Sequence, residues 1–387
     1  METFSELSKK LTKDLSADVK KQQGIYFTPS SITRKLTNLV FDYNPDIRTV
    51  LEPSCGSGQF LDELKEREIN VTSVEQNKDI FNEIAGTYQN IINDDFLEYS
   101  FGDSSFDLVI GNPPYFVVPK ASVEKVYHKY FTGRPNIYVP FILKSFELLN
   151  DDGILAFVLP SNFLNCVYYN ELRKYLSRYH ILHVEIDTSK FMETAQPICL
   201  FVVQKTVSTK KNFIHCFGDI LVFKPEKDIV SIKKLCQGST TLSQLDCTMN
   251  VGNIVWNQCK KDLTDDPTQT RLIYSGDFKN NTLTLPQHKD SSKKHFINKK
   301  ASRETVLLVN RGYGTGKYHL NYCIVEGIEY LVENHCMVIS SKDHTVFEKI
   351  IKSFENPKTQ QFIDLVFSNN AINIEEFMNV LPIFNLL

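Results

Sequence analysis

The sequence predicts an α/β fold, in which a doubly wound, Rossmann-like domain with a mostly parallel sheet precedes a smaller α+β domain. Two observations support this prediction. Between residues 30 and 205, short apolar runs typical of buried strands alternate with helical patterns, as they do in βαβ units. Around residues 204–212 this alternation stops, and longer polar stretches and hairpin-like pieces follow. Such a change indicates a second domain, in line with a length of 387 residues.

Each element of the first domain has its own local signal. Residues 30–43 follow Pro29 and carry a helical stripe of Ile32, Leu36 and Val40, which predicts a helix. Further helices are predicted at residues 60–68, 78–88, 136–150 and 168–179. Strands are predicted at residues 48–51, 70–75, 89–96, 106–114, 153–160, 181–187 and 198–205. Residues 150–153, Asn-Asp-Asp-Gly, are expected to end the helix that precedes them.

The chain divides into three predicted segments: a polar helical segment at residues 1–23, the α/β domain at 24–208 and the second domain at 209–387. The first residues are too polar for a signal peptide, and the apolar runs are too short to span a bilayer. The nine cysteines include no Cys-x-x-Cys pair, which argues against a zinc ribbon and for a reducing compartment. We therefore expect a cytoplasmic protein with no membrane partner and no metal.

The net charge of −3 does not identify a partner, but its distribution is informative. Residues 207–387 hold 22 Lys and Arg against 19 Asp and Glu, whereas the rest of the chain holds 21 against 27. Between Lys279 and Lys317 there are nine basic residues and two acidic ones. This segment could neutralise phosphates, although a solvated lysine-rich loop has the same composition.

Residues 50–61, VLEPSCGSGQFL, place a glycine-rich turn between a strand and a helix. Ligands of an open parallel sheet bind where the strands end, and Gly56 and Gly58 let the backbone approach a ligand closely. The turn is not the dinucleotide fingerprint, because Leu61 stands where a third glycine is needed. Glu52, at its start, suits a ligand with a cationic amino group. A tight turn without a ligand is the alternative from this motif alone.

Two more acidic residues follow strands of the predicted sheet. Glu75 ends the next strand, 23 residues after Glu52, where a doubly wound fold places the carboxylate that binds ribose hydroxyls. Asp95 ends the third strand and is suited to accept hydrogen bonds from an exocyclic amine, with Phe96 lining a pocket for an aromatic ring. A lone Asp is more often an Asx turn or a helix cap, so both interpretations stay open.

The fourth strand runs into Asn112, Pro113, Pro114 and Tyr115. The prolines restrict the backbone of this turn, so its carbonyl groups are held in place. The side-chain oxygen of Asn112 and the carbonyl of Pro113 can accept both N–H groups of a planar amine. Such contacts favour a pyramidal nitrogen whose lone pair points at an electrophile. Tyr115 offers a face on which a flat base can stack, and a purely structural proline turn is the alternative.

In this order the motifs resemble those of the gamma class of S-adenosylmethionine-dependent DNA adenine-N6 methyltransferases, the group of the TaqI and Eco57I-like enzymes. Residues 24–36, GIYFTPSSITRKL, resemble motif X, which precedes motif I in this class. VLEPSCGSGQF resembles motif I, SVEQN motif II, NDDFL motif III, FDLVIGNPPYF motif IV and ICLFVVQK motif VIII. The similarity extends over nearly the whole chain.

The resemblance implies S-adenosyl-L-methionine as the cofactor and gives the motif residues their roles. Thr28 and the turn Glu52–Gly58 would hold its methionine part, Glu75 its ribose, and Asp95 with Phe96 its adenine. The implied cofactor-binding residues are Thr28, Glu52, Ser54, Cys55, Gly56, Gly58, Glu75, Asp95, Phe96 and Asn112. The implied catalytic residues, which act on a flipped adenine, are Asn112, Pro113, Pro114 and Tyr115.

Two positions depart from the family pattern. A second aromatic residue, from motif VIII, often stacks on the other face of the target base in this family. Here the aligned position is Val203, and Phe201 is the nearest substitute. Motif I has Cys55 where relatives often have a small residue, and we expect it to pack rather than to act as a nucleophile, because this chemistry needs no thiol.

By the same resemblance, residues 209–387 would form a target-recognition domain for double-stranded DNA. Residues 252–278 and 307–322 resemble the specificity domain of TaqI-like enzymes. Asn310, Arg311 and Lys317 lie around glycines there and could contact base edges or phosphates, with a structural role for Arg311 as the alternative. The nearby Gly-Thr-Gly-Lys is not a P-loop, because the required earlier glycine and the following Ser or Thr are missing.

The favoured function is a site-specific DNA adenine-N6 methyltransferase of a restriction–modification or DNA-protection system, in which a cognate restriction endonuclease is a partner but not a physical requirement. The alternative applies the same chemistry to guanine N2 of RNA or to a protein glutamine amide, although such enzymes usually lack motif X before motif I and a long basic C-terminal domain. A non-catalytic DNA-binding protein is disfavoured by the intact motifs. The 23 residues before motif X are too few for a fused nuclease.

Overall fold

The computed structural model describes residues 4–133, 135–189, 191–194, 196–312, 318–368 and 371–384. The chain folds into two compact units. The first comprises Met1–Cys216 and Leu221–Ile229, and the second comprises Phe217–Ile220 and Val230–Leu387. The chain passes from one unit to the other within the hairpin of β8 (Ile214–Phe217) and β9 (Ile220–Phe223) and within helix α8 (Glu226–Leu235).

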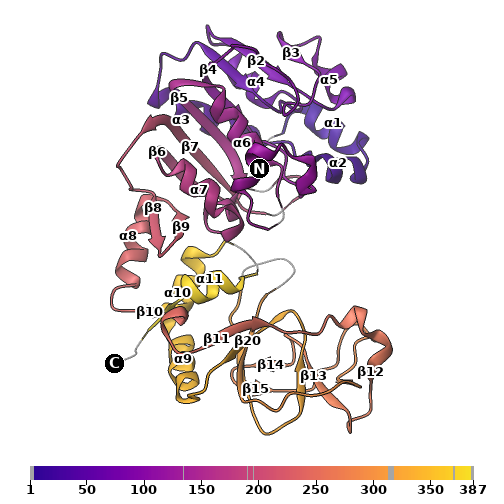
Figure 1. Ribbon diagram of the computed structural model, residues 1–387. Coiled ribbons are helices and arrows are strands. Elements are labelled where there is room, and N and C mark those ends of the chain that lie inside the picture. The colour runs from indigo at the N-terminus through magenta and orange to yellow at the C-terminus, as the bar shows by residue number, and fades with distance from the viewer. Residues whose placement is uncertain are drawn as a thin grey trace. The chain divides into compact units, whose positions relative to one another are not determined.

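The first unit is built on a seven-stranded sheet with the order β3-β2-β1-β4-β5-β7-β6. Strands β3, β2, β1, β4 and β5 run parallel, whereas β7 is antiparallel to both β5 and β6 (Figure 1). The strands are β1 (Thr49–Glu52), β2 (Asn70–Val74), β3 (Ile91–Ile92), β4 (Phe106–Gly111), β5 (Leu149–Pro160), β6 (Tyr179–Asp187) and β7 (Ile198–Val207). The helices are α1 (Glu6–Asp14), α2 (Ala17–Gln23), α3 (Ser30–Tyr43), α4 (Gln59–Leu64), α5 (Lys78–Ile84), α6 (Tyr138–Glu147) and α7 (Asn170–Leu176). The predicted Rossmann-like α/β fold with a mostly parallel sheet is confirmed.

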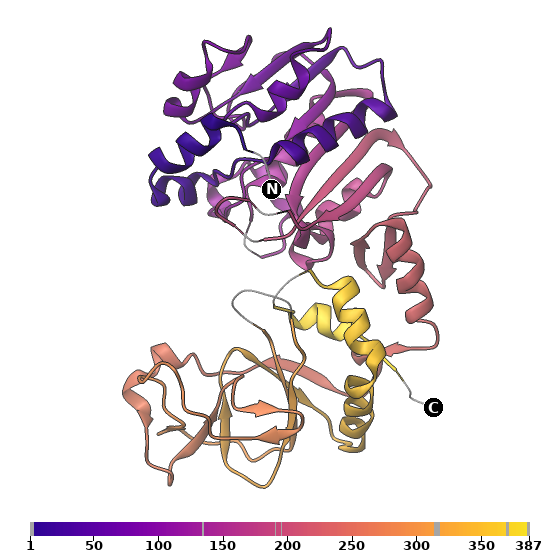
Figure 2. The ribbon, with the colours of Figure 1, turned by 180° about the vertical axis from the view of Figure 1, so that it is seen from behind.

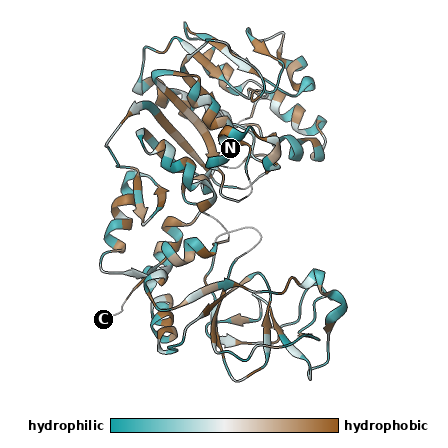
Figure 3. Ribbon diagram, in the orientation of Figure 1, coloured by the Kyte–Doolittle hydropathy of each residue, from teal (hydrophilic) through white to brown (hydrophobic). Residues whose placement is uncertain are grey.

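Helices cover both faces of this sheet, because its central strands are apolar on both sides. Along β5, Leu155 and Phe157 join the core that contains α6 and α7, whereas Ile154 and Ala156 join the core that contains α3 and α4. Figures 1 and 2 show these two layers from opposite sides, and the central strands are coloured as hydrophobic in Figure 3. A strand buried on both faces is a continuous apolar run rather than an alternating one, as residues 153–160 are.

The start of β5 differs from the prediction. Residues 150–153 do not simply end the preceding helix, because β5 already begins at Leu149. Its register to β4 shifts within this segment, and Asp152 has a positive φ of 62°. The Asn150 side chain secures the bulge by donating from Nδ2 to Asp107 Oδ1 at 2.7 Å. The polar turn signal is therefore a bulge inside a strand.

Helices α1 and α2 pack onto the body of the first unit. Leu11 of α1 is buried with Phe27 and Ile80. The hydroxyl of Ser8 lies 2.8 Å from that of Ser57 in the glycine-rich turn, and both residues are buried. The N-terminal segment, polar by composition, thus supports the turn between β1 and α4.

In the part of the chain that the structure describes, the second unit contains two four-stranded sheets, the two-stranded sheets β10-β21 and β14-β15, helices α9 to α11 and the end of α8. The four-stranded sheets have the orders β11-β20-β17-β18 and β12-β16-β13-β19. β17 and β18 pair antiparallel, as expected of the hairpin-like pieces in this part of the sequence. The strands are β10 (Thr240–Thr241), β11 (Thr248–Val251), β12 (Leu263–Thr264), β13 (Thr270–Ile273), β14 (Phe278–Lys279), β15 (Thr282–Leu283), β16 (Phe296–Ile297), β17 (Val306–Asn310), β18 (Tyr322–Val325), β19 (Tyr330–Val332), β20 (Cys336–Ser340) and β21 (Pro382–Ile383). The helices are α9 (Thr345–Glu355), α10 (Pro357–Val366) and α11 (Ile374–Asn379).

Within the described ranges, none of the helices of either unit has both the length and the apolar character that crossing a membrane requires.

A fully buried arginine holds the segment that follows β5. Arg173, on α7, has no exposed surface. Its guanidinium donates to the backbone carbonyls of Phe163 at 2.7 Å, Cys166 at 2.8 Å and Leu221 at 2.7 Å, and to that of Asn165 at 3.2 Å. Buried carbonyl groups need donors, and here one side chain supplies several at once.

We expect Arg173→Met to lower the free energy of unfolding by about 3 kcal/mol or more, because buried carbonyls lose a charged donor worth about 1.5–3 kcal/mol per bond. Urea denaturation of the full chain measures the change. The matched control is Arg178→Met, since Arg178 is exposed just after α7 and its side chain contacts Tyr175, three residues earlier. It should change stability by no more than about 0.5 kcal/mol, and equal effects of the two substitutions would contradict the assigned role.

Candidate active site

A pocket lies at the carboxyl ends of the parallel strands of the first unit. It encloses about 610 Å³ of empty space, part of which is open to solvent. Its walls come from the segment after α2, the turn after β1 and the residues that follow β2, β3 and β4. The lining residues are Gln23, Gly24, Ile25, Tyr26, Phe27, Pro53, Ser54, Gly56, Glu75, Gln76, Asn77, Ile80, Asp94, Asp95, Phe96, Asn112, Pro114 and Phe141. This edge of an open parallel sheet is where ligands bind.

The turn after β1 needs its glycines. Gly56 has a backbone φ of 52° and Gly58 a φ of 80°, values that residues with a Cβ atom rarely adopt. A Cβ on Gly58 would also lie 2.5 Å from the ring of Tyr88. The backbone N–H of Gly56 donates to Glu75 Oε2 at 2.8 Å, so the turn after β1 is tied to the carboxylate at the end of β2.

Two carboxyl groups are buried beside this turn. Glu52 is 1% exposed, and its Oε2 has no hydrogen-bond partner among the described residues. Burial, with a further contribution from Glu75, raises the pKa of Glu52 well above its ordinary value. Burial also raises the pKa of Glu75 to about 7, although backbone N–H groups of Asn77 and Gly56 act in the opposite direction. A ligand with a cation or several hydroxyl groups would compensate both buried carboxyls.

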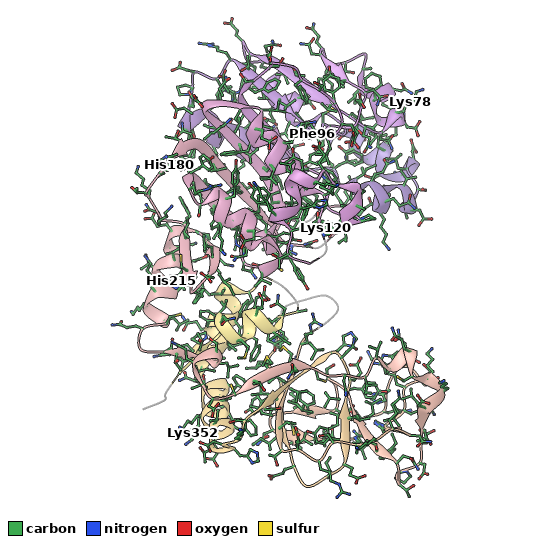
Figure 4. The ribbon with its side chains drawn as sticks, in the orientation of Figure 1. Lys78, Phe96, Lys120, His180, His215 and Lys352 are labelled. Carbon is green, nitrogen blue, oxygen red and sulfur yellow. The ribbon has the colours of Figure 1, made fainter. Side chains whose placement is uncertain are left out.

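The residues after β3 line another wall of the pocket. Asp95 accepts from the backbone N–H of Leu97 at 2.9 Å with one oxygen and from Gln76 Nε2 at 3.1 Å with the other. The Asx-turn interpretation of Asp95 is therefore observed, while its position in the pocket also suits an amine ligand. Phe96 is 2% exposed and packs at 4.9 Å from the ring of Phe141, and Figure 4 labels it within this unit.

Asn112 is held in one orientation at the end of β4. Its Nδ2 donates to the carbonyl of Tyr26 at 3.1 Å and to Thr28 Oγ1 at 3.0 Å. A backbone carbonyl can only accept, so the amide nitrogen must face Tyr26 and the amide oxygen must face away. The arrangement presents Oδ1 of Asn112 as an acceptor for a donor from outside.

Tyr115 lies close to that acceptor. Its hydroxyl contacts Asn112 Oδ1 and also lies 2.5 Å from the carbonyl oxygen of Val158. A phenol has one proton, so it can donate to one of these two acceptors at a time. Burial raises the pKa of Tyr115 well above its ordinary value, which keeps the hydroxyl protonated at neutral pH.

A close backbone contact joins the motif X segment to this turn. Gly24 caps α2 with a φ of 64°. A Cβ there would lie 2.8 Å from the backbone nitrogen of Tyr115 and 2.8 Å from the ring of Phe116. Glycine is therefore required at this position both for its conformation and for space.

Not every residue expected to bind the cofactor lines the pocket. Ser54, Gly56, Glu75, Asp95, Phe96 and Asn112 do. Thr28 is 4% exposed and accepts from Asn112, which makes it a support for that side chain. Cys55 is buried against Leu61 and Ile84, and burial raises its thiol pKa well above the ordinary value, as expected for a packing residue.

Several lining residues were not predicted individually. Gln23 accepts from Asn77 Nδ2 at 2.8 Å, and Asn77 also caps α5. Tyr26 and Phe27 lie inside the segment predicted as motif X, but the sequence pattern did not single them out. Asn77, two residues after Glu75, could have been found as a helix N-cap. Phe141, on α6, had no local signal, because it reads as an ordinary core residue.

The structure corrects the prediction for Phe201. This residue has no exposed surface. Its ring is stacked on Phe223 with centroids 5.8 Å apart and meets Phe163 edge-on at 5.2 Å. Because those two rings already cover it, Phe201 packs the core and is not placed to stack on a base.

The structure also corrects the prediction for Asn310 in the second unit. Its Nδ2 donates to the carbonyl of His319 at 2.8 Å, and its Oδ1 accepts from the backbone N–H of Asn321 at 2.6 Å. The amide therefore closes its own loop and is not available to a base edge. Arg311 is partly exposed, and its backbone is hydrogen-bonded. Lys317 lies outside the described residues.

Comparison with known proteins matches the Eco57I restriction-modification methylase family to residues 10–191. Residues 10–191 of the chain are thus similar to restriction-modification methylases. Modification methylase CviBIII of Paramecium bursaria Chlorella virus NC1A is 29% identical over 99% of this chain and 100% of its own length. Type II methyltransferase M.CvrRI of Paramecium bursaria Chlorella virus XZ-6E is 26% identical over 99% of this chain and 100% of its own length. The type IIG restriction endonuclease BpuSI has a TM-score of 0.47 at 11% identity, covering 98% of this chain and 60% of that structure.

The methyltransferase uses S-adenosyl-L-methionine as its cofactor, and the pocket fits that molecule. Glu52 directly precedes Pro53 in the pocket wall, and its buried Oε2 has no partner among the described residues, which suits the ammonium group of the methionine part. Glu75 and Asp95, with Phe96, line the walls and suit the ribose hydroxyls, the adenine amine and the adenine ring. When bound, the cofactor supplies a methyl group activated on a sulfonium.

We expect cofactor affinity to fall, by up to about tenfold per pH unit, as the pH drops below about 7, because the pKa of Glu75 is raised to about 7 and only its ionised form accepts from two hydroxyls. Calorimetric titration at a series of pH values measures the effect. Glu75→Gln should weaken binding and remove this pH dependence, whereas Glu83→Gln, at an exposed ion pair with Lys10, should retain both. An unchanged slope in Glu75→Gln would rule out Glu75 as the titrating group.

Proposed function

We propose that this chain methylates N6 of a flipped adenine within a short duplex site. As a restriction-modification methylase, the chain is a DNA methyltransferase; the adenine N6 target and base flipping are the proposal. The observation that carries it is the fixed orientation of Asn112, whose Nδ2 donates to Tyr26 and Thr28 and whose Oδ1 faces away from them as an acceptor that Tyr115 contacts. That geometry suits a substrate nitrogen with N–H groups to donate.

The chemistry needs acceptors rather than a strong base. The adenine amine is a poor nucleophile because its lone pair is delocalised into the ring. Asn112 Oδ1 and the Pro113 carbonyl accept its two N–H groups and favour a pyramidal nitrogen with a localised lone pair. A C–N bond then forms while the bond from sulfur to the methyl carbon breaks, and its electron pair stays on sulfur. The extra proton on nitrogen leaves to solvent after the transfer.

Tyr115 must change partners when a target base enters. Its hydroxyl now contacts Asn112 Oδ1, the acceptor assigned to the target amine. If the hydroxyl donated its hydrogen bond to the Val158 carbonyl alone, which lies 2.5 Å away, Asn112 would be released. The ring of Tyr115 would then provide the face on which the base stacks.

The second unit provides the proposed DNA-binding surface. A base inside a duplex cannot reach a pocket of this kind, so it has to leave the stack at a cost of a few kcal/mol. The basic segment from Lys279 to Lys317, with nine basic and two acidic residues, suits phosphate contacts. Arg311 and Lys317 remain the proposed contacts to base edges or phosphates within residues 209–387.

The deciding experiment offers the purified chain tritiated cofactor with three substrates: duplex DNA of mixed sequence, ribosomal RNA and a release-factor peptide. Label in DNA that is recovered as N6-methyladenine after digestion is the expected result. Label in the RNA or the peptide, with none in DNA, would favour guanine N2 or a glutamine amide and would overturn the proposal.

Asn112→Ala should lower the rate of methyl transfer by on the order of 10²–10³ or more, because a preorganised polar group at the reacting nitrogen is lost, while cofactor binding is retained. Single-turnover transfer and calorimetric cofactor titration measure the two quantities. Asn150→Ala is the matched control, since Asn150 bonds to Asp107 at the other end of β4. Transfer at the normal rate in Asn112→Ala would remove Asn112 from the mechanism.

Tyr115→Phe should retain transfer within about tenfold, whereas Tyr115→Ala should reduce kcat/KM roughly 5- to 150-fold, which corresponds to a stacking contribution of ~1–3 kcal/mol. The phenylalanine keeps the ring and removes only the hydroxyl that contacts Asn112. Steady-state kinetics with a DNA substrate separates the two variants. A loss of equal size in both would show that the hydroxyl, rather than the ring, is what transfer needs.

A further inference from the structure

Three possible metal-binding side chains meet in the second unit, outside the proposed catalytic residues. Asp277 lies in the turn between β13 and β14, His288 lies in the segment between β15 and β16, and His295 directly precedes β16. Among the residues that the structure describes, one donor atom from each lies within 4.8 Å of the other two. The rings of His288 and His295 are 4.4 Å apart. Residues from two separate segments therefore converge on one point.

The atoms that face one another there lack partners. Asp277 has no exposed surface, and its Oδ1 makes no hydrogen bond in the described structure. The same is true of Nε2 of His288 and of Nδ1 of His295, both of which are buried atoms. Buried polar atoms without partners are costly, and three of them in one group point to a missing ligand rather than to a single local defect.

The distances are close to those of a metal site. Asp277 Oδ1 lies 4.0 Å from His288 Nε2. Donor atoms of a tetrahedral zinc ion, each ~2.0–2.2 Å from the metal, are roughly 3.4 Å apart. Shifts of about an ångström in the segment between β15 and β16 would close the site.

The surrounding charges predict a moderate rather than a high affinity for a metal ion. Arg271 Nη2 donates to the other oxygen of Asp277 at 2.9 Å, and Lys293 lies 5.0 Å from the centre of the Tyr274 ring. These cations oppose a dication, whereas Asp277 and two imidazoles attract it.

We propose that Asp277, His288 and His295 bind one divalent transition-metal ion of the zinc type, with water completing its coordination. The ion joins the turn after β13 to the lysine-rich segment before β16 and holds that segment in one conformation. Its role is structural, because none of the residues assigned to methyl transfer is among the three ligands. This site departs from the metal-free protein that the cysteine pattern predicts, because its donors come from histidine and aspartate at irregular spacing.

The test equilibrates the full-length chain, first stripped with a chelator, with Zn²⁺ alone and counts the ions retained after desalting. One ion per chain and a higher Tm with Zn²⁺ are expected for the wild type. His288→Gln and His295→Gln should each weaken binding by at least about tenfold and lose the rise in Tm. His335→Gln is the matched control, because His335 also contacts a carboxylate, Glu333, yet lies outside the group.

Substitution with Co²⁺ keeps the proposal testable even if a variant fails to fold. The wild-type chain should show cobalt absorption bands without a sulfur-to-cobalt charge-transfer band. This band is the check against binding by cysteine, of which the chain has nine. A sulfur band, no retained ion, or equal retention by all three histidine variants would each overturn the proposal. None of these measurements needs DNA or the methyl donor, so their outcome is independent of the proposed function.

Discussion

The hydrogen bond from Asn112 Nδ2 to the Tyr26 carbonyl is the constraint on which the candidate active site depends. It joins the end of β4 to a segment almost ninety positions earlier in the chain, and it decides which end of the amide faces the pocket. Gly24, which lets that segment approach the backbone of Tyr115, and α1, which packs against Phe27, hold the donor and the acceptor in place. Without this support the amide could rotate, and its oxygen would no longer be aimed.

The same edge of the sheet carries buried carboxyl groups whose hydrogen-bonding capacity is not fully used within the described structure. Among the described residues, Glu52 Oε2 has no hydrogen-bond partner, and burial raises the pKa of Glu75 to about 7. Burying such groups costs free energy unless a ligand compensates them. The glycine turn, which lets the backbone approach a ligand closely, and the two carboxyls are therefore best explained together, as a site whose polar groups are completed by a cationic, hydroxyl-bearing cofactor.

Local sequence signals predicted what local chemistry controls. Glycines at positive φ, an asparagine before two prolines, and acidic residues at strand ends could be located from their spacing, and six of the expected cofactor residues line the pocket. The errors were of another kind. Phe201 was chosen for its strand position, but Phe163 and Phe223 already cover its ring. Asn310 was chosen for its place beside glycines, but its amide closes its own loop. Neither set of partners can be seen in a linear pattern.

The sequence by itself determined the α/β class, the order of most strands and helices, and the similarity of residues 10–191 to a family of methylases, because these follow from periodicity and short motifs. Tertiary structure alone decided the orientation of Asn112, the support role of Thr28 and the meeting of Asp277, His288 and His295. The physical reason is that hydrogen bonds and metal ligands act over a few ångströms, whatever the separation along the chain. Only folding brings such side chains within that range.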